Sequence, residues 1–192
     1  MSLPTDSEIR EIVQRVVRHT LGDSADLSPA GQGEIAQTAP DQTIAIGADH
    51  GGFDLKETLK KNLADWGYAV VDVGTHSKDA VDYPDFAHAA ASLVSSGKAW
   101  RGVIIDGAGI GSCMVANKVP GVRAALAYDH ASALNSREHN DANVLTLGAG
   151  LIGDNLARQI LKTWLETGFG GGRHARRVEK ISAVEKQYLK GA

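Results

Sequence analysis

The sequence predicts an α/β fold in which a five-stranded parallel sheet is covered by helices on both faces. Short apolar runs rich in β-branched residues recur along the chain, as expected of buried parallel strands. Segments with the apolar spacing of helices separate these runs, which is the alternation of βαβ units with right-handed crossovers. Glycine and polar residues follow several of the strands, at the sheet edge where such folds bind ligands.

The expected elements of this domain begin with a strand over residues 44–47. The following helix, over residues 53–66, directs Leu55, Leu59 and Leu63 inward. The other expected strands cover residues 69–73, 103–106, 122–127 and 142–147. The other expected helices cover residues 84–95, 131–140, 151–166 and 175–189, with one more opening after the glycines that follow residue 106. We expect the domain to span residues 42–192.

Composition excludes several classes of protein. Hydrophobic residues make up 43% of the 192 residues, and the net charge is only −3, so no nucleic-acid surface is expected. No apolar stretch is long enough for a membrane span or a secretory signal. Cys113 is the single cysteine, which excludes an intrachain disulfide and favours the cytoplasm.

The N-terminal region predicts a short amphipathic helix within residues 1–22. Thr5 and Glu8 have capping-box spacing. The apolar residues share one helical face and are Ile9, Ile12, Val13, Val16, Val17 and Leu21. Residues 23–41 are rich in Gly, Pro and Ser and are typical of a linker. A tethered helix with an apolar stripe needs a partner, which is either another protein or the chain's own domain or oligomer.

The segment 103–118 carries the clearest functional pattern. An apolar strand ends at Asp106, glycines follow at positions 107, 109 and 111, and a helix then begins. Glycines allow close backbone approach, and the amides opening a helix favour negative charge. We therefore expect an anion, or an oxyanion formed during a reaction, to bind over residues 107–112 beside the Asp106 carboxylate. The alternative is an ordinary strand-to-helix turn.

Three further clusters are candidates for chemistry. Asp49 and His50 directly follow the first strand, where His can move protons, although a structural Asp-His pair is the alternative. His139 could act as an acid or base with Asn140 as an amide donor, or both could cap a helix. Three arginines and His174 open the last predicted helix, which opposes its dipole and favours a phosphate there over a solvated basic face.

Two other kinds of site are not expected. The histidines are scattered and no metal-ligand motif occurs. Nucleotide binding is also disfavoured, because the glycine turn is neither a P-loop nor G-x-G-x-x-G, and Asp72 lies within its strand rather than after it.

Taken together, these segments resemble the type B ribose-5-phosphate isomerase and LacA/LacB sugar-phosphate isomerase family. The resemblance spans about residues 42–190 in the family's order. The matching segments are residues 47–56 (GADHGGFDLK), 82–84 (DYP), 107–111 (GAGIG), 116–124 (ANKVPGVRA), 136–143 (SREHNDAN) and 172–178 (GRHARRV).

The resemblance implies a Rossmann-like three-layer sandwich and a homodimer, or a dimer of dimers, with active sites built across the dimer interface. It implies interconversion of aldose and ketose phosphates through an enediolate, without metal or cofactor. His139 would open the sugar ring, and amides after the third strand would bind the enediolate oxygen. The residues implied to bind the sugar and its phosphate are Asp49, His50, Tyr83, Gly107, Gly109, Ile110, Gly111, Ser112, Asn140, Arg173, His174 and Arg177.

Departures from the family pattern affect the base. Asp106 stands where many members have a Cys, Ser112 where others have a Glu, Ala108 where a hydroxyl residue is usual, and Gly150 where an Arg is expected. We expect Asp106 to act as the base, since burial can adapt a carboxylate to this work. The alternatives are Cys113 as the base, a different sugar phosphate as substrate, or a protein that only binds its ligand.

The N-terminal helix lies outside this match. Its pattern from Glu8 to Val17 resembles the encapsulation peptides of bacterial microcompartment enzymes. This implies a shell protein as partner for residues 5–21 and a location inside a microcompartment.

Overall fold

The structure is a computed structural model that describes residues 42–189. The predicted amphipathic helix, with its shell-binding segment, and the predicted linker over residues 23–41 lie outside the described residues. The predictions for the main domain can be compared with the structure directly.

Five parallel strands form one sheet, as predicted, in the order β2-β1-β3-β5-β4. The strands are β1 (Thr43–Ala48), β2 (Ala69–Asp72), β3 (Arg101–Asp106), β4 (Ala124–Leu126) and β5 (Val144–Gly148). β3 lies in the centre and all six of its residues are buried, as expected for a strand covered on both faces. Its last residue, Asp106, is opposite Gly148 in β5.

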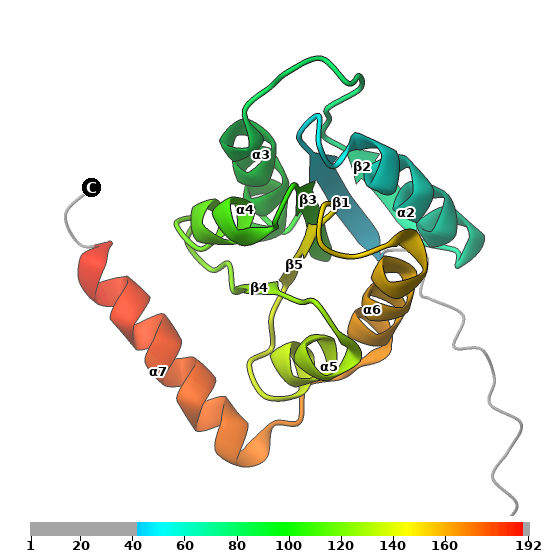
Figure 1. Cartoon of the computed structure of the whole chain (residues 1–192). Helices are drawn as coiled ribbons and strands as arrows, with labels where there is room; N and C mark the ends of the chain where they lie inside the picture. Colours follow the sequence, from blue (N-terminus) through cyan, green and yellow to red (C-terminus); the bar gives the residue numbers. More distant parts are fainter. Residues whose placement is uncertain (1–41, 190–192) are drawn as a thin grey trace, which may run out of the picture. The chain divides into compact units, whose positions relative to one another are not determined.

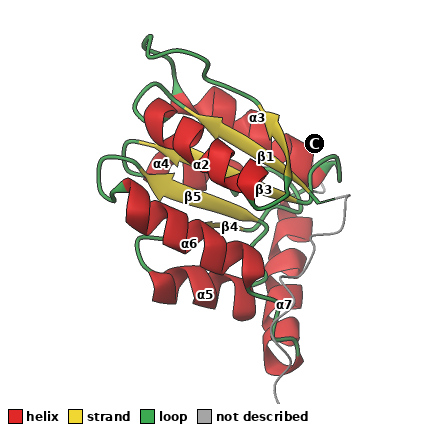
Figure 2. Ribbon diagram, turned by 90° about the vertical axis from the view of Figure 1, so that its right-hand side faces the viewer, coloured by secondary structure: helices red, strands yellow, loops and turns green. Residues whose placement is uncertain are grey.

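Helices cover both faces of the sheet and give three layers (Figure 1). The helices are α2 (Phe53–Asp65), α3 (Tyr83–Ser95), α4 (Ile110–Ala116), α5 (His130–Glu138), α6 (Asp154–Glu166) and α7 (Gly172–Tyr188). α2, α5 and α6 pack one apolar cluster against the sheet, and α3 and α4 pack a second cluster against the opposite face. Figure 2 shows the strands between these two groups of helices.

Side-chain size explains the two apolar layers. Leu55, Leu59 and Leu63 project from α2 into the larger cluster, which also holds the fully buried Trp164 of α6. The opposite layer is thinner, because alanines such as Ala87, Ala90 and Ala91 let α3 approach the sheet closely. The alternation of apolar strands and amphipathic helices in the sequence thus becomes a doubly covered sheet.

Several element boundaries differ from the sequence prediction. β4 is only three residues long and β5 begins at residue 144, because Asn143 uses its side chain to pair with the Arg123 amide and the Gly121 carbonyl. α6 begins at Asp154 rather than residue 151, since the amides of Leu151 and Ile152 turn back to the Gly148 carbonyl.

The last helix, α7, contributes no buried residue to the domain. It begins at Gly172, three residues earlier than predicted, directly after Gly171 with φ +59°. The carboxylate of Glu185 accepts a hydrogen bond from the Gly121 amide, which ties α7 to the loop after α4. None of the helices within residues 42–189 is long and apolar enough to cross a membrane.

Candidate functional site

Asp106 lies where β3 ends and the glycine turn begins. Its Oδ1 accepts hydrogen bonds from the amides of Ala108, at 2.8 Å, and Gly109, and its Oδ2 accepts one from the Ser112 amide at 3.0 Å. The residue is only 5% exposed. The turn therefore wraps around the carboxylate, and its amides hold the side chain in one orientation.

This arrangement corrects one expectation from the sequence. We expected the amides of residues 107–112 to face a ligand with Asp106 beside them, but the amides of Ala108, Gly109 and Ser112 bind the carboxylate itself. Within residues 42–189, the amides of Gly107, Ile110 and Gly111 have no hydrogen-bond partner. Ile110 and Gly111 are in the first turn of α4, where a helix leaves its amides unpaired, and Gly107 lies in the turn before it. These three amides can therefore donate to an oxygen atom of a ligand.

Close packing explains why glycine is required in the turn. Gly109 has φ +75°, and a Cβ atom there would lie 2.6 Å from the Leu126 side chain and 2.8 Å from the Leu147 carbonyl carbon. Gly148 faces the turn from β5, and its Cβ would lie 2.6 Å from the Ala108 carbonyl oxygen. The backbone around Asp106 is thus pressed against β4 and β5.

Two other predicted residues lie at the same edge. The Oδ1 of Asp49 accepts a hydrogen bond from the Gly52 amide at 2.9 Å, which fixes the loop after β1. The ring of Tyr83 covers Gly111 so closely that a Cβ there would lie 2.5–2.7 Å from the phenol atoms. The predicted gathering of Asp49 and the glycine turn at the carboxyl ends of the strands is therefore observed.

His50 also lies at this edge, but it contacts the loop before α3. Its Nδ1 is 3.1 Å from the carbonyl oxygen and 3.2 Å from the amide nitrogen of Val81, so this nitrogen donates to the carbonyl in one tautomer and accepts from the amide in the other. The side chain is exposed, and Nε2 remains available for a ligand.

Cys113 points away from the carboxylate. Its Sγ lies 3.5 Å from the Ala124 carbonyl oxygen of β4 and 3.6 Å from Nδ2 of Asn117. Burial raises the pKa of the Cys113 thiol above its ordinary value, so the thiol stays protonated at neutral pH. This geometry favours Asp106 over Cys113 as a base.

His139 and His174 form the centre of a second cluster. Their rings stack with centroids 4.1 Å apart, and Nδ1 of His139 lies 2.7 Å from Nδ2 of Asn135. Asn140 donates to the backbone and side-chain oxygens of Asn135, both at 3.3 Å. Desolvation lowers the pKa of His174, and the charges of its cationic neighbours lower it further.

Arg173 and Arg177 give this second cluster its positive charge. Both are exposed, and within residues 42–189 no carboxylate forms an ion pair with either. Nε of Arg173 donates to Nε2 of His174 at 3.4 Å. Unpaired guanidinium groups beside a neutral imidazole suit a phosphate group.

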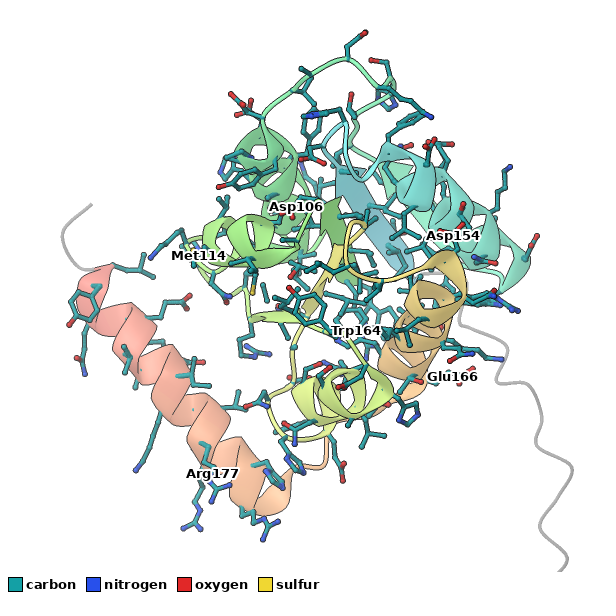
Figure 3. All side chains as sticks on the ribbon, in the orientation of Figure 1. Asp106, Met114, Asp154, Trp164, Glu166 and Arg177 are labelled. Atoms are coloured by element: carbon teal, nitrogen blue, oxygen red, sulfur yellow. The ribbon has the colours of Figure 1, made fainter. Side chains whose placement is uncertain are left out.

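The two clusters lie at opposite ends of the strands. α5 starts at the carboxyl edge of the sheet and runs back, so His139 lies near the start of β3, where the Gly102 amide donates to the Asn143 carbonyl. The carbonyl of Glu138 binds the amide of Gly170, which brings the start of α7 to the same end. Figure 3 shows Asp106 and Arg177 well apart. One chain therefore does not bring the cluster around His139 together with the cluster around Asp106.

Sequence reasoning missed Tyr128 as a member of the Asp106 cluster. Its hydroxyl donates to the Ala108 carbonyl at 2.7 Å. Tyr128 comes two residues after β4, and the rule that strand ends meet at one edge of a parallel sheet would have included it. Among residues 42–189, no group of three or more His, Cys, Asp and Glu side chains could hold a metal ion.

Comparisons with known proteins match this domain throughout. A family profile described as Ribose/Galactose Isomerase covers residues 44–181. The chain is 42% identical over 144 residues to ribose-5-phosphate isomerase B of Escherichia coli, which is 75% of this chain and 97% of that protein. It is 44% identical over 149 residues to D-erythrulose-4-phosphate isomerase of Pectobacterium atrosepticum, 76% of this chain and 96% of that protein.

A solved structure agrees with these sequence matches. The structure of Clostridium thermocellum ribose-5-phosphate isomerase B superposes with a TM-score of 0.76 at 50% identity. The match covers 77% of this chain and 99% of that one.

Proposed function

The chain belongs to the ribose/galactose isomerase family, and on that premise we propose that it interconverts an aldose phosphate and a ketose phosphate of the ribose 5-phosphate and ribulose 5-phosphate type. The observation that carries the mechanism is the buried Asp106 carboxylate, fixed by three amides beside three unpaired ones. A base held next to hydrogen-bond donors suits proton transfer at a carbon next to a carbonyl.

Asp106 moves the proton between neighbouring carbon atoms. A carboxylate has about four acceptor positions, so the three amide bonds leave a lone pair to take the proton from C2 of the open-chain aldose. The C–H electrons form a C1–C2 double bond, and the carbonyl oxygen on C1 becomes negative. The carboxyl group then returns the proton to C1 while the hydroxyl proton on O2 moves to O1, which gives the ketose.

The remaining groups at this edge bind the sugar. The unpaired amides of Gly107, Ile110 and Gly111 are placed to stabilise the negative oxygen of the enediolate. The amides of Gly109 and Ser112 take a different role, because they hold Asp106 rather than the substrate. Asp49 and Tyr83 border the same turn and are proposed to contact the sugar hydroxyls, as is His50.

A second copy of the chain completes the site in this proposal. Ring opening needs a proton donor and acceptor, assigned to His139, and the phosphate needs Arg173, His174 and Arg177. These groups lie at the far end of the sheet from Asp106 in the same chain. A dimer, or a dimer of dimers, in which each site takes Asp106 from one copy and His139 from the other, would join the two halves.

Exposed apolar surface supports this assembly. On α7, Ile181, Val184 and Tyr188 are 48%, 54% and 84% exposed and lie along one stripe. On α4, next to the glycine turn, Ile110 and Met114 are 47% and 63% exposed. Apolar side chains gathered on helices in this way are typical of a protein interface.

Two substitutions test which residue is the base. Asp106→Asn keeps the side-chain shape but removes the basic oxygen, and we expect it to lower kcat by orders of magnitude without changing the fold. Cys113→Ser keeps the size of the side chain and should leave most of the turnover, since the thiol contacts Ala124 rather than the turn. The opposite result, with Asp106→Asn active and Cys113→Ser inactive, would move the base to Cys113.

The length of the sugar that the enzyme accepts has to be determined with a panel of sugar phosphates. Relatives named for a pentose phosphate and for a tetrose phosphate are 42% and 44% identical to this chain, so identity does not separate the two substrates. We expect isomerisation of ribose 5-phosphate in a panel that also contains D-erythrulose 4-phosphate and a hexose phosphate. If no substrate in the panel is isomerised, the result would instead favour a protein that only binds a sugar phosphate and assembles with a partner.

We also propose that residues 5–21 bind a microcompartment shell protein. The amphipathic pattern and the Gly- and Pro-rich tether of the sequence support this proposal. Fusion of residues 1–22 to a fluorescent protein in a shell-forming host should give fluorescent foci. Diffuse fluorescence would contradict a targeting role.

A further inference from the structure

Tyr128 contacts the same peptide group that binds the Asp106 carboxylate. Its hydroxyl lies 2.7 Å from the carbonyl oxygen of Ala108, and a carbonyl can only accept, so the phenol is the donor. The amide of the next residue, Gly109, donates to Oδ1 of Asp106. The carbonyl of Ala108 and the amide of Gly109 belong to one planar peptide unit.

We propose that Tyr128 is a positioning residue for the isomerase reaction, acting through the peptide between Ala108 and Gly109 on the Asp106 carboxylate. The hydrogen bonds form a chain from the Tyr128 hydroxyl through this peptide to Oδ1. A hydrogen bond to a carbonyl polarises the amide and strengthens its N–H as a donor. This inference rests on the proposed role of Asp106 as the base.

The surroundings give this peptide no other side-chain support. Ala108 has no hydrogen-bonding side chain, and Gly148 packs against the Ala108 backbone without a side chain of its own, since a Cβ there would lie 2.6–2.9 Å from Ala108 atoms. Among the described residues, the hydroxyl of Tyr128 is the only side-chain group that bonds to the Ala108 carbonyl. The orientation of the peptide plane is therefore set by Tyr128 on one side and by Asp106 on the other.

Tyr128 is itself held firmly. It follows β4 and packs its partly buried ring against the apolar cluster beneath α5 and α6. The nearby titratable side chains are Asp49, His50, Tyr83 and Cys113, and none of them hydrogen-bonds to the Asp106 carboxylate. Removal of the Tyr128 hydroxyl thus changes the support of this carboxylate while leaving the other titratable groups in place.

The test is Tyr128→Phe, assayed in the full-length protein with ribose 5-phosphate across pH. Loss of one hydrogen bond to the turn should lower kcat about tenfold, with KM changed less than about twofold. The acid limb of the pH–kcat profile should move to higher pH, because a weaker Gly109 donor stabilises the negative carboxylate less. Substitution of 3-fluorotyrosine at position 128, which makes the phenol a stronger donor, should move that limb the opposite way.

Tyr68→Phe is the matched control. Tyr68 is also half-buried against the same apolar cluster, but it lies before β2 at the other edge of the sheet. The Tyr68→Phe substitution should leave kcat and the pH profile unchanged. Wild-type kcat and an unmoved acid limb in Tyr128→Phe would overturn the inference, as would a lowered melting temperature with an unmoved limb.

Failure of this inference can be separated from failure of the proposed function. If Asp106→Asn retains turnover, the base lies elsewhere and the proposed function is wrong in that respect whatever Tyr128→Phe does. If Asp106→Asn is inactive while Tyr128→Phe behaves as wild type, only the role of Tyr128 is wrong. If Tyr128→Phe does not fold, the fluorotyrosine protein still decides the question, because an unmoved acid limb there rejects the proposal.

Discussion

The imidazole rings of His139 and His174 stack with their centroids 4.1 Å apart and their planes 5° from parallel. Two stacked imidazoles cannot both become positive without repulsion. Desolvation lowers the pKa of His174, followed by the charges of His139, Arg173 and Arg177, so His174 is neutral at neutral pH. The cluster is therefore positively charged through its arginines and also contains a neutral imidazole that can take up a proton.

Anion binding should promote protonation of His174, which then becomes a third cation beside Arg173 and Arg177. We expect sulfate, which keeps two negative charges across this pH range, to raise the pKa of His174 when it binds between the guanidinium groups. Because the bound pKa is higher than the free one, sulfate affinity should rise as pH falls through the two values. An NMR titration of the His174 ring protons with and without sulfate measures the shift, and Arg177→Gln should reduce it. Identical titration curves would place the anion elsewhere.

A shared active site predicts complementation between two inactive variants. In a mixed dimer of Asp106→Asn and His139→Asn chains, one site carries both substitutions and the other carries neither. Random reassociation makes half of the dimers mixed, so the mixture should recover about one quarter of wild-type activity. Co-refolding of the two variants, followed by a turnover assay, measures this fraction. If each chain carries its own complete site, the mixture stays inactive.

The sheet could be predicted because strands that are buried on both faces appear in the sequence as continuous apolar runs. Residues 44–48 of β1 and 102–105 of β3 are all apolar or glycine, since neither face of a central parallel strand meets water. The rule that strand ends meet at one edge then placed Asp49 beside Asp106. Shorter elements were harder to predict. β4 has only three residues, because the side chains of Asn143 and Asn117 replace backbone pairing around it.

The internal arrangement of the site could not be read from sequence. The glycine pattern indicated an anion near residues 107–112, but whether that anion is a ligand or the neighbouring Asp106 depends on dihedral angles that spacing does not specify. The hydrogen bond from Tyr128 likewise joins residues twenty positions apart. Separation of His139 from Asp106 follows from the direction of α5, which only the three-dimensional topology makes plain.

Acid stability should depend on Asp72. Burial alone would raise the pKa of this carboxyl, but hydrogen bonds from Lys56 and Lys60 and from the Gly74 amide outweigh it and lower the pKa to about 2. Because the folded pKa lies below the unfolded one, the resulting stability is complete above about pH 4 and disappears as pH falls through about 2. The difference corresponds to roughly 2 kcal/mol.

Urea unfolding of the wild type and Asp72→Asn at several pH values measures this contribution. The variant should be less stable at neutral pH, because it removes a partner of Lys56, whose side chain is fully buried. The difference in unfolding free energy should narrow by roughly 2 kcal/mol toward pH 2. The exposed Asp65→Asn serves as the control and should show no such narrowing. A pH-independent difference would mean that Asp72 acts through packing alone.

Gly148→Ala should damage both stability and turnover, because Gly148 supports the turn around Asp106. The new Cβ would lie 2.6–2.9 Å from backbone atoms of Ala108, and backbone cannot move aside as a flexible side chain can. We expect a loss of about 2 kcal/mol in unfolding free energy and a lower kcat, since the shifted turn no longer holds Asp106 in place. Gly153→Ala is the matched control five residues later, where a Cβ meets nothing within 4 Å. Denaturant unfolding and turnover of both variants measure the effect, and equal behaviour of the two would show that the contact between β5 and the turn does not position the carboxylate.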